Sequence, residues 1–307
     1  MTPRLGRRRL LTTATAALAL PGVARGDARP APLAELVAQV DRARLEATVT
    51  TLAAFPTRWT PSPAFPQVED WMHEAFARVG AERIARQAYP HSSAGTRHNV
   101  LCGDPLDPRG VLLLGAHLDS ISETPATRAP GANDNASGIA AMLEACRILT
   151  RQTLRKGLVF VAFSGEEQDL QGSTACAAIA RRQGWPIELM LNLDMLGHPT
   201  ATPSGPLFIE YDQGNAVAGN EAAAAHHGRQ AARLAATFTD LATEHTDIWD
   251  SDYMPFEARG YPCIGFYDGG VEAPEYHSTA DLPEAVDFDR LFQVTRLVVA
   301  TLAKAAG

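Results

Sequence analysis

The sequence predicts an α/β fold in which a mostly parallel β-sheet carries helices on both faces. Two observations support this. Apolar strands and helical segments alternate from about residue 98 to the C-terminus, an order typical of parallel sheets, whose crossover connections are usually helices. In addition, residues 110–115 are apolar at consecutive positions rather than at alternate ones, which indicates a strand buried on both faces.

The predicted elements follow from apolar spacing and from turn residues. Leu33, Leu36, Val37 and Val40 begin a run at helical spacing, and the Pro- and Thr-rich stretch 56–66 predicts a loop after it. The same criteria predict helices at 33–49, 68–79, 138–150, 171–182, 221–236 and 287–304, and strands at 98–102, 110–115, 157–164, 188–194 and 262–267.

The first 26 residues differ from the rest of the chain. They contain five arginines and no acid, and the apolar run 10–20 is too short to span a membrane comfortably. Residues 6–11 resemble a twin-arginine export signal, and Ala24 and Gly26 supply the small residues that a signal peptidase needs. We expect cleavage near Gly26, an exported periplasmic or extracellular protein, and one catalytic domain over 27–307; the plain alternative is a basic N-terminal tail.

Charge and cysteine spacing exclude two further classes. Without the five N-terminal arginines, 22 basic and 35 acidic side chains give a formal charge of −13, which argues against nucleic-acid binding. The four cysteines form no CxxC pair and so do not predict a zinc knuckle. The even number of cysteines permits one or two disulfides, and free buried thiols are equally consistent with the sequence. The four residues are Cys102, Cys146, Cys176 and Cys263.

Residues able to bind a metal follow the predicted strands. His117 and Asp119 lie two residues apart on an extended segment, so their side chains point to the same side. The pair suits a metal-bound imidazole whose other ring nitrogen is held by a carboxylate, although a surface histidine beside an acid would show the same pattern. Asp134, in a Gly- and Ala-rich segment, suits a bridge between two cations or, equally, a helix cap.

Three further motifs supply carboxylates and a second imidazole. Glu166 and Glu167 follow strand 157–164, where a cation would offset their repulsion: one side chain would bind metal and the other would act as a general base. An acidic first helical turn is the plain alternative. Asp194 closes an apolar strand, and His277 lies in the segment 275–281. These nitrogen and oxygen donors suit a dinuclear zinc centre.

Five motifs carry a family resemblance. In chain order they are GAHLDS, GANDNASG, FSGEEQDLQGS, NLDMLGH and EYHSTAD, with SDYMPFEARGYPCIGF between the last two. Each is loose alone, but the ordered set resembles the M28 family of zinc metallopeptidases, especially its secreted bacterial leucine aminopeptidases, over about residues 95–285. The resemblance implies a phosphorylase/hydrolase-like fold, a three-layer α/β sandwich around a mixed, mostly parallel sheet.

The resemblance also assigns roles to residues of this chain. It implies two Zn²⁺ ions per chain, one held by His117, Asp134 and Asp194 and the other by Asp134, Glu167 and His277. Glu166 becomes the general base for a water between the ions, and Asp119 supports His117. The implied activity is removal of N-terminal residues from peptides or proteins by an enzyme that we expect to be a monomer without stable membrane insertion.

Departures from the family pattern concern the substrate rather than the ligands. Asp169 stands where the family often has glycine, and Tyr253 where many members have histidine. Four aromatic residues are candidates either for an apolar or aromatic pocket or for the core, and the core is favoured for Phe256; the others are Tyr253, Tyr267 and Tyr276. The alternatives are a glutaminyl cyclase of the same fold, which usually has one zinc and a tryptophan at the position of Tyr276, a carboxypeptidase of the superfamily, and a catalytically inactive binding protein.

Overall fold

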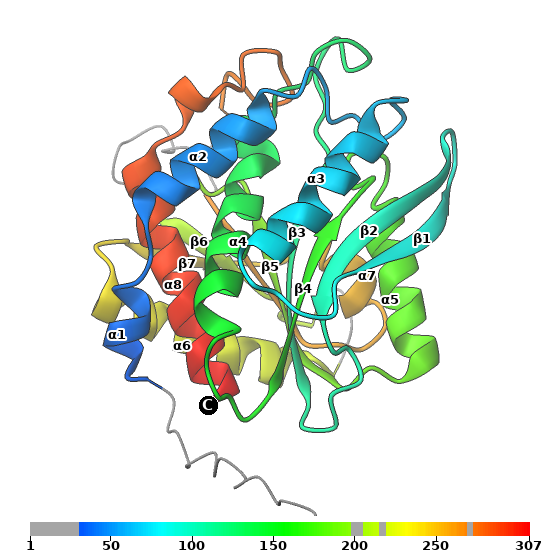
Figure 1. Cartoon of the computed structure of the whole chain (residues 1–307). Coiled ribbons are helices and arrows are strands. Elements are labelled where there is room, and N and C mark those ends of the chain that lie inside the picture. The colour runs from blue at the N-terminus through cyan, green and yellow to red at the C-terminus, as the bar shows by residue number, and fades with distance from the viewer. Residues whose placement is uncertain (1–30, 198–204, 215–218, 269–272) are drawn as a thin grey trace, which may run out of the picture.

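One mixed sheet of eight strands organises the computed structural model, which describes residues 31–197, 205–214, 219–268 and 273–307 (Figure 1). The strand order across the sheet is β1-β2-β4-β3-β5-β8-β6-β7. The strands are β1 (Ala85–His91), β2 (Gly95–Gly103), β3 (Val111–His117), β4 (Gly157–Phe163), β5 (Ile187–Asp194), β6 (Leu207–Glu210), β7 (Thr243–Thr246) and β8 (Cys263–Tyr267).

The centre of the sheet is parallel. The neighbouring strands β4, β3, β5 and β8 run in one direction, whereas β1 with β2, β2 with β4, and β6 with β8 pair antiparallel. Every residue of β3 is buried, as its continuous apolar sequence predicts. The prediction of a mixed, mostly parallel sheet is therefore confirmed.

Helices cover both faces of this sheet (Figure 1). Alternate residues of β3 belong to different cores: Leu112 and Leu114 to the larger cluster, Val111 and Leu113 to the smaller one. The larger cluster contains side chains of α1 (Leu33–Val37), α2 (Arg42–Ala53), α3 (Phe65–Arg78), α4 (Gly138–Leu149), α6 (Glu221–Phe238) and α8 (Phe288–Ala306). The smaller cluster contains side chains of α5 (Gln171–Gln183) and α7 (Met254–Glu257). This is the expected three-layer sandwich.

Some boundaries differ from those predicted. The segment 33–49 forms two helices, because α1 ends at Val37 and α2 begins only at Arg42. The carboxylate of Asp41 caps α2 by accepting the N–H of Ala43 at 2.9 Å. The strands β1, β6 and β7 were not predicted. β1 and β7 are largely exposed and polar, and β6 and β7 have only four residues each, so none shows a clear apolar pattern.

The four cysteines are all buried and carry free thiols in the described structure. The Sγ atoms of Cys102 on β2 and Cys146 on α4 lie 3.9 Å apart. The predicted export signal at residues 1–26 lies outside the described residues. Among the described helices, none has both the length and the apolar character needed to cross a bilayer.

Candidate metal centre

The topology brings three of the predicted motifs to one edge of the sheet. His117 is the last residue of β3, and Asp194 is the last residue of the neighbouring β5. Glu166 and Glu167 follow the end of β4, which pairs with the other side of β3. Because these strands are parallel, their carboxyl ends meet at the same edge, where binding sites of α/β proteins commonly form.

Two connecting segments complete the cluster. Asp134 lies in the segment Ala132–Ser137 (η1), where its own backbone is not helical, with φ of −106° and ψ of 90°. The carboxylate of Asp281 accepts hydrogen bonds from the backbone N–H groups of Asn133 at 2.8 Å and Asp134 at 3.0 Å. His277 adopts a left-handed backbone conformation, with φ of 53°, which is unusual for a non-glycine residue and occurs preferentially at functional sites. Its ring stacks on that of Tyr276, with centroids 3.7 Å apart.

The five predicted ligands form two sets that share Asp134. One oxygen of Asp134 lies 3.2 Å from Nε2 of His117, which is also 3.3 Å from an oxygen of Asp194. The other oxygen of Asp134 lies 3.2 Å from Nε2 of His277, which is 3.0 Å from an oxygen of Glu167. Within each set, one donor atom per residue lies within 4.8 Å of the others. This geometry suits two cations bridged by one carboxylate.

Asp119 lies behind the cluster and is fully buried. Its backbone carbonyl oxygen is 3.2 Å from Nδ1 of His117, and its carboxylate is 3.9 Å from the same atom. A proton held on Nδ1 by these acceptors leaves Nε2 free to bind a metal. The carboxylate also accepts the backbone N–H groups of Glu166 at 3.2 Å and Glu167 at 3.3 Å. Asp119 thus positions two motifs.

Three residues that position the proposed ligands or their backbone segments were not singled out in the sequence. Ser251 donates a hydrogen bond of 2.6 Å to Asp194. Arg58 is fully buried and donates to the carbonyl oxygens of Leu118 at 2.9 Å and Gly131 at 2.8 Å, next to two ligand segments. Asp281 is the third. Ser251 and Asp281 lie within recognised motifs, but only the contacts show what they do, and no motif marks Arg58.

The electrostatics of the cluster favour bound cations. Burial alone would raise the pKa of Asp134, but the imidazoles of His117 and His277 lower it well below its usual range. Burial alone would lower the pKa of His277, but Asp134 and Glu167 raise it to about 10. Burial raises the pKa of Glu167 to about 7. Its Oε1 is buried without a hydrogen-bond partner among the described residues, as expected for an oxygen that faces a metal.

Glu166 differs from the proposed ligands. Burial raises its pKa well above the ordinary value, and the carboxylates of Asp194 and Asp252 add to this effect. Asp252 is itself fully buried, and burial raises its pKa to about 7. A carboxyl group with a raised pKa at the edge of a cavity is a candidate general acid or base.

A cavity of about 340 Å³ opens onto this cluster. All five proposed ligands and Glu166 line it, and most of the other lining residues are acidic or aromatic. The remaining lining residues are Asp169, Leu170, Met195, Glu210, Trp249, Asp250, Ser251, Tyr253, Tyr267 and Tyr276. Trp249 is 79% exposed, so its ring stands at the margin. Of the four aromatic candidates, Tyr253, Tyr267 and Tyr276 line the cavity. Tyr253 also belongs to the smaller core cluster, as does Phe256, which does not line the cavity.

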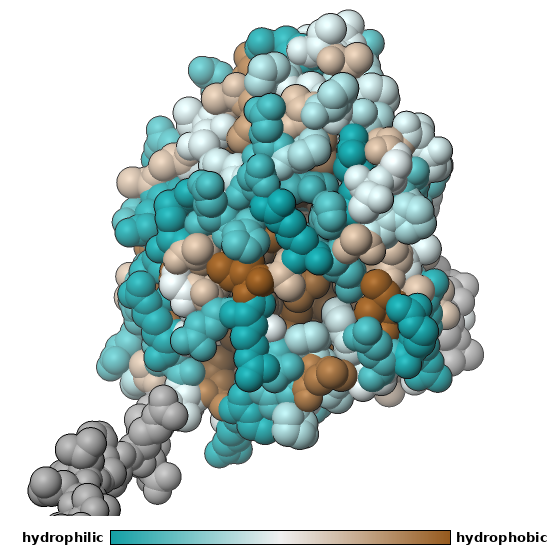
Figure 2. Space-filling model, turned by 45° about the vertical axis from the view of Figure 1, so that its right-hand side comes forward, coloured by the Kyte–Doolittle hydropathy of each residue, from teal (hydrophilic) through white to brown (hydrophobic). Residues whose placement is uncertain are grey.

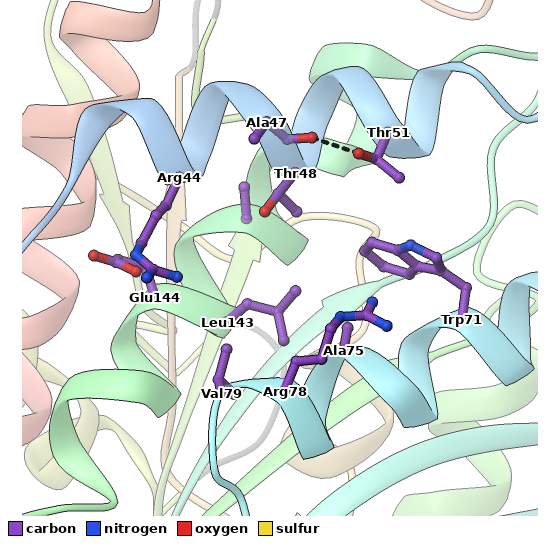
Figure 3. Close-up of a pocket in the computed structure, with 11 residues that line it drawn as sticks. Arg44, Ala47, Thr48, Thr51, Trp71, Ala75, Arg78, Val79, Leu143 and Glu144 are labelled. Atoms are coloured by element: carbon purple, nitrogen blue, oxygen red, sulfur yellow. Dashed lines mark hydrogen bonds between the residues drawn. The ribbon is translucent and has the colours of Figure 1, made fainter.

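Another hollow, of about 320 Å³, lies between α2, α3 and α4 (Figure 3). Figure 3 shows Arg44, Arg78 and Trp71 around it. Among the described residues, no group of potential metal ligands converges there. On the face shown in Figure 2, hydrophilic residues predominate and apolar ones form small, separate patches, some of them in a hollow. The cavity at the sheet edge is therefore the best-supported site.

Comparisons with known proteins identify the family of the chain. The model of peptidase family M28 matches residues 100–302. The chain is similar to a probable leucine aminopeptidase 1 of Trichophyton verrucosum, with 26% identity over 88% of this chain and 76% of the relative.

Two solved structures share the fold. The LapA aminopeptidase of Legionella pneumophila has a TM-score of 0.76 and 16% identity, over 89% of this chain and 74% of that one. A glutaminyl cyclase of Porphyromonas gingivalis has a TM-score of 0.71 and 20% identity, over 87% and 99%. At these identities the two structures support the fold, and the family match supports the predicted resemblance. The chain belongs to peptidase family M28.

Proposed function

We propose that this protein is a dinuclear zinc aminopeptidase that removes N-terminal residues from peptides or proteins. The observation that carries the proposal is the position of Asp134, whose two oxygens face different histidines at 3.2 Å each. Asp194 completes one ligand set and Glu167 the other. Two complete sets that share a carboxylate favour a two-metal hydrolase over an enzyme with one zinc ion.

Each residue of the site has a role in this proposal. His117, Asp134 and Asp194 would hold one zinc ion, and Asp134, Glu167 and His277 the other. The two ions, when bound, would supply Lewis acidity to the scissile carbonyl and make the attacking water more acidic. Glu166 accepts the proton of that water and returns it to the departing amine, a task that suits its raised pKa.

The cavity supports cleavage at a free N-terminus. A volume of about 340 Å³ accommodates a small ligand rather than a long peptide. Apart from the proposed ligands and Glu166, its walls include the carboxylates of Asp169 and Asp250. Negative charge of this kind attracts a protonated α-amine. The name of the Trichophyton relative, a leucine aminopeptidase, is consistent with the same activity.

Glu166→Gln tests the proposal. The amide cannot accept the proton but has nearly the same shape, so we expect two zinc ions per chain and a loss of about 10²–10⁴-fold in turnover. Zinc content and release of arylamine from aminoacyl arylamides measure the two effects, and Glu284→Gln, an exposed position, is the control. Near-normal turnover of Glu166→Gln would exclude Glu166 as the base.

Zinc content, combined with a cyclisation assay, separates the alternatives. Cyclisation of a peptide with N-terminal glutamine, together with one zinc ion per chain, would identify a glutaminyl cyclase. Purified protein without zinc and without activity would identify a binding protein.

Export through residues 1–26 also belongs to our proposal. N-terminal sequencing of secreted protein should find a chain that begins near Asp27, and an intact Met1 would contradict it.

A further inference from the structure

Glu210 lies on the same face of the sheet as the proposed ligand Asp194. In the sheet, Glu210 of β6 pairs with Gly265 of β8, and Gly265 pairs with Asn192 of β5. Paired residues point to the same side, as do residues two apart, so Asn192, Asp194 and Glu210 share a face. Glu210 is two strands, roughly 10 Å, across the sheet from the strand that carries Asp194.

Gly265 leaves space for Glu210 and for its partner Tyr253. A Cβ atom at Gly265 would lie 2.5 Å from a carboxylate oxygen of Glu210 and 2.5 Å from the ring of Tyr253. The hydroxyl of Tyr253 donates a hydrogen bond of 2.9 Å to Glu210 and accepts one of 2.7 Å from the backbone N–H of Trp249. These contacts hold the carboxylate of Glu210 and the ring of Tyr253 in place, and both residues line the cavity.

Within the described part of the cavity wall, no lysine or arginine faces the carboxylate of Glu210. Among the described residues that line the cavity, the side chains able to carry positive charge are His117 and His277, which face the proposed metal ligands. Glu210 is only 4% exposed. Burial raises its pKa to about 8, so a cation that entered the cavity would favour the ionised carboxylate.

We propose that the cavity selects a cationic N-terminal residue, lysine or arginine, whose charged end pairs with Glu210 while its α-amine and scissile carbonyl lie at the metal centre. This inference rests on the proposed function and specifies its substrate class. Met195, Tyr253 and Tyr267 supply apolar wall for the aliphatic stem, the usual packing of long basic side chains. A leucine side chain carries no charge and so gains nothing from a buried carboxylate.

The experiment compares aminoacyl arylamides of lysine, arginine and methionine, because methionine is long and unbranched but neutral. In the zinc-loaded wild-type protein we expect kcat/KM for lysine or arginine to exceed that for methionine by about tenfold or more. In Glu210→Gln, the amide still accepts from Tyr253 but lacks the charge, and this ratio should fall at least tenfold. Glu244→Gln, an exposed position on the neighbouring strand β7, should keep the wild-type ratio.

A second variant guards against a folding defect in Glu210→Gln. Tyr253→Phe removes the hydroxyl that orients Glu210 and keeps the ring, so it should lower the same ratio by a smaller factor. Preference for methionine in the wild type, or a ratio unchanged in Glu210→Gln, overturns the inference and leaves the proposed function intact. Failure to hydrolyse any arylamide overturns both.

Discussion

Replacing Asp281 by asparagine tests how the bridging ligand Asp134 is held. Asp281 is 4% exposed, and its carboxylate accepts two backbone N–H groups, from Asn133 at 2.8 Å and from Asp134 at 3.0 Å. Asparagine has nearly the same shape but offers one oxygen, so one N–H group would face an amide NH₂ instead of an acceptor. The change also removes a negative charge that favours the charged form of the buried Arg58.

The magnitude follows from these contacts. A hydrogen bond to a charged group contributes about 1.5–3 kcal/mol, and a buried donor without an acceptor costs a similar amount. We therefore expect Asp281→Asn to lower the unfolding free energy of the metal-free protein by about 2–4 kcal/mol. Because the segment that carries Asp134 would also be less well placed, zinc affinity should fall by about 10–100-fold.

Two measurements check this expectation. Urea unfolding of the metal-free protein gives the change in unfolding free energy, and competition with a chelator gives the change in zinc affinity. Glu284→Gln, three residues away and exposed, controls for the loss of one acid. If Asp281→Asn matched this control in both measurements, the two hydrogen bonds would not be what positions Asp134.

Three further predictions concern the same region. Ser251→Ala removes the 2.6 Å hydrogen bond to Asp194, so chelator competition should show about tenfold weaker binding of one zinc ion and little change for the other; equal weakening of both would contradict the assignment of Asp194 to one ligand set. Removing zinc leaves the carboxylates of Asp134, Glu167 and Asp194 facing one another, so the thermal unfolding midpoint should fall. The fall should be equivalent to about 4 kcal/mol when free zinc is 1,000 times its dissociation constant. Equal midpoints with and without chelator would argue against a bound metal. Burial raises the pKa of Glu210 to about 8, so this group contributes stability at low pH that is lost as the pH rises from its unfolded-state pKa toward 8. Glu210→Gln should therefore show a smaller decline in unfolding free energy between pH 5.5, 7 and 8.5, measured by urea unfolding. An identical decline in both proteins would show that Glu210 does not titrate in this range.

The layers of the fold and the types of donor at the site follow from local sequence patterns. Residues 110–115 are apolar throughout because β3 is covered on both faces, and local spacing shows that directly. His117 and Asp194 close two such strands. Since parallel strands end at a common edge, their convergence follows from chain order and strand direction alone. The exposed strand β7 gave no such signal because solvent imposes no apolar pattern on it.

The arrangement of these donors and of the residues around them depends on contacts between distant segments of the chain. That each oxygen of Asp134 faces a different histidine depends on Asp281, 147 residues away in the chain, which fixes the backbone of Asp134. The pairing of Glu210 with Tyr253 likewise depends on the register of β6 against β8. Contacts of this kind form between segments that have no local relation in the sequence, because packing of the whole sheet and its helices sets the distances between them.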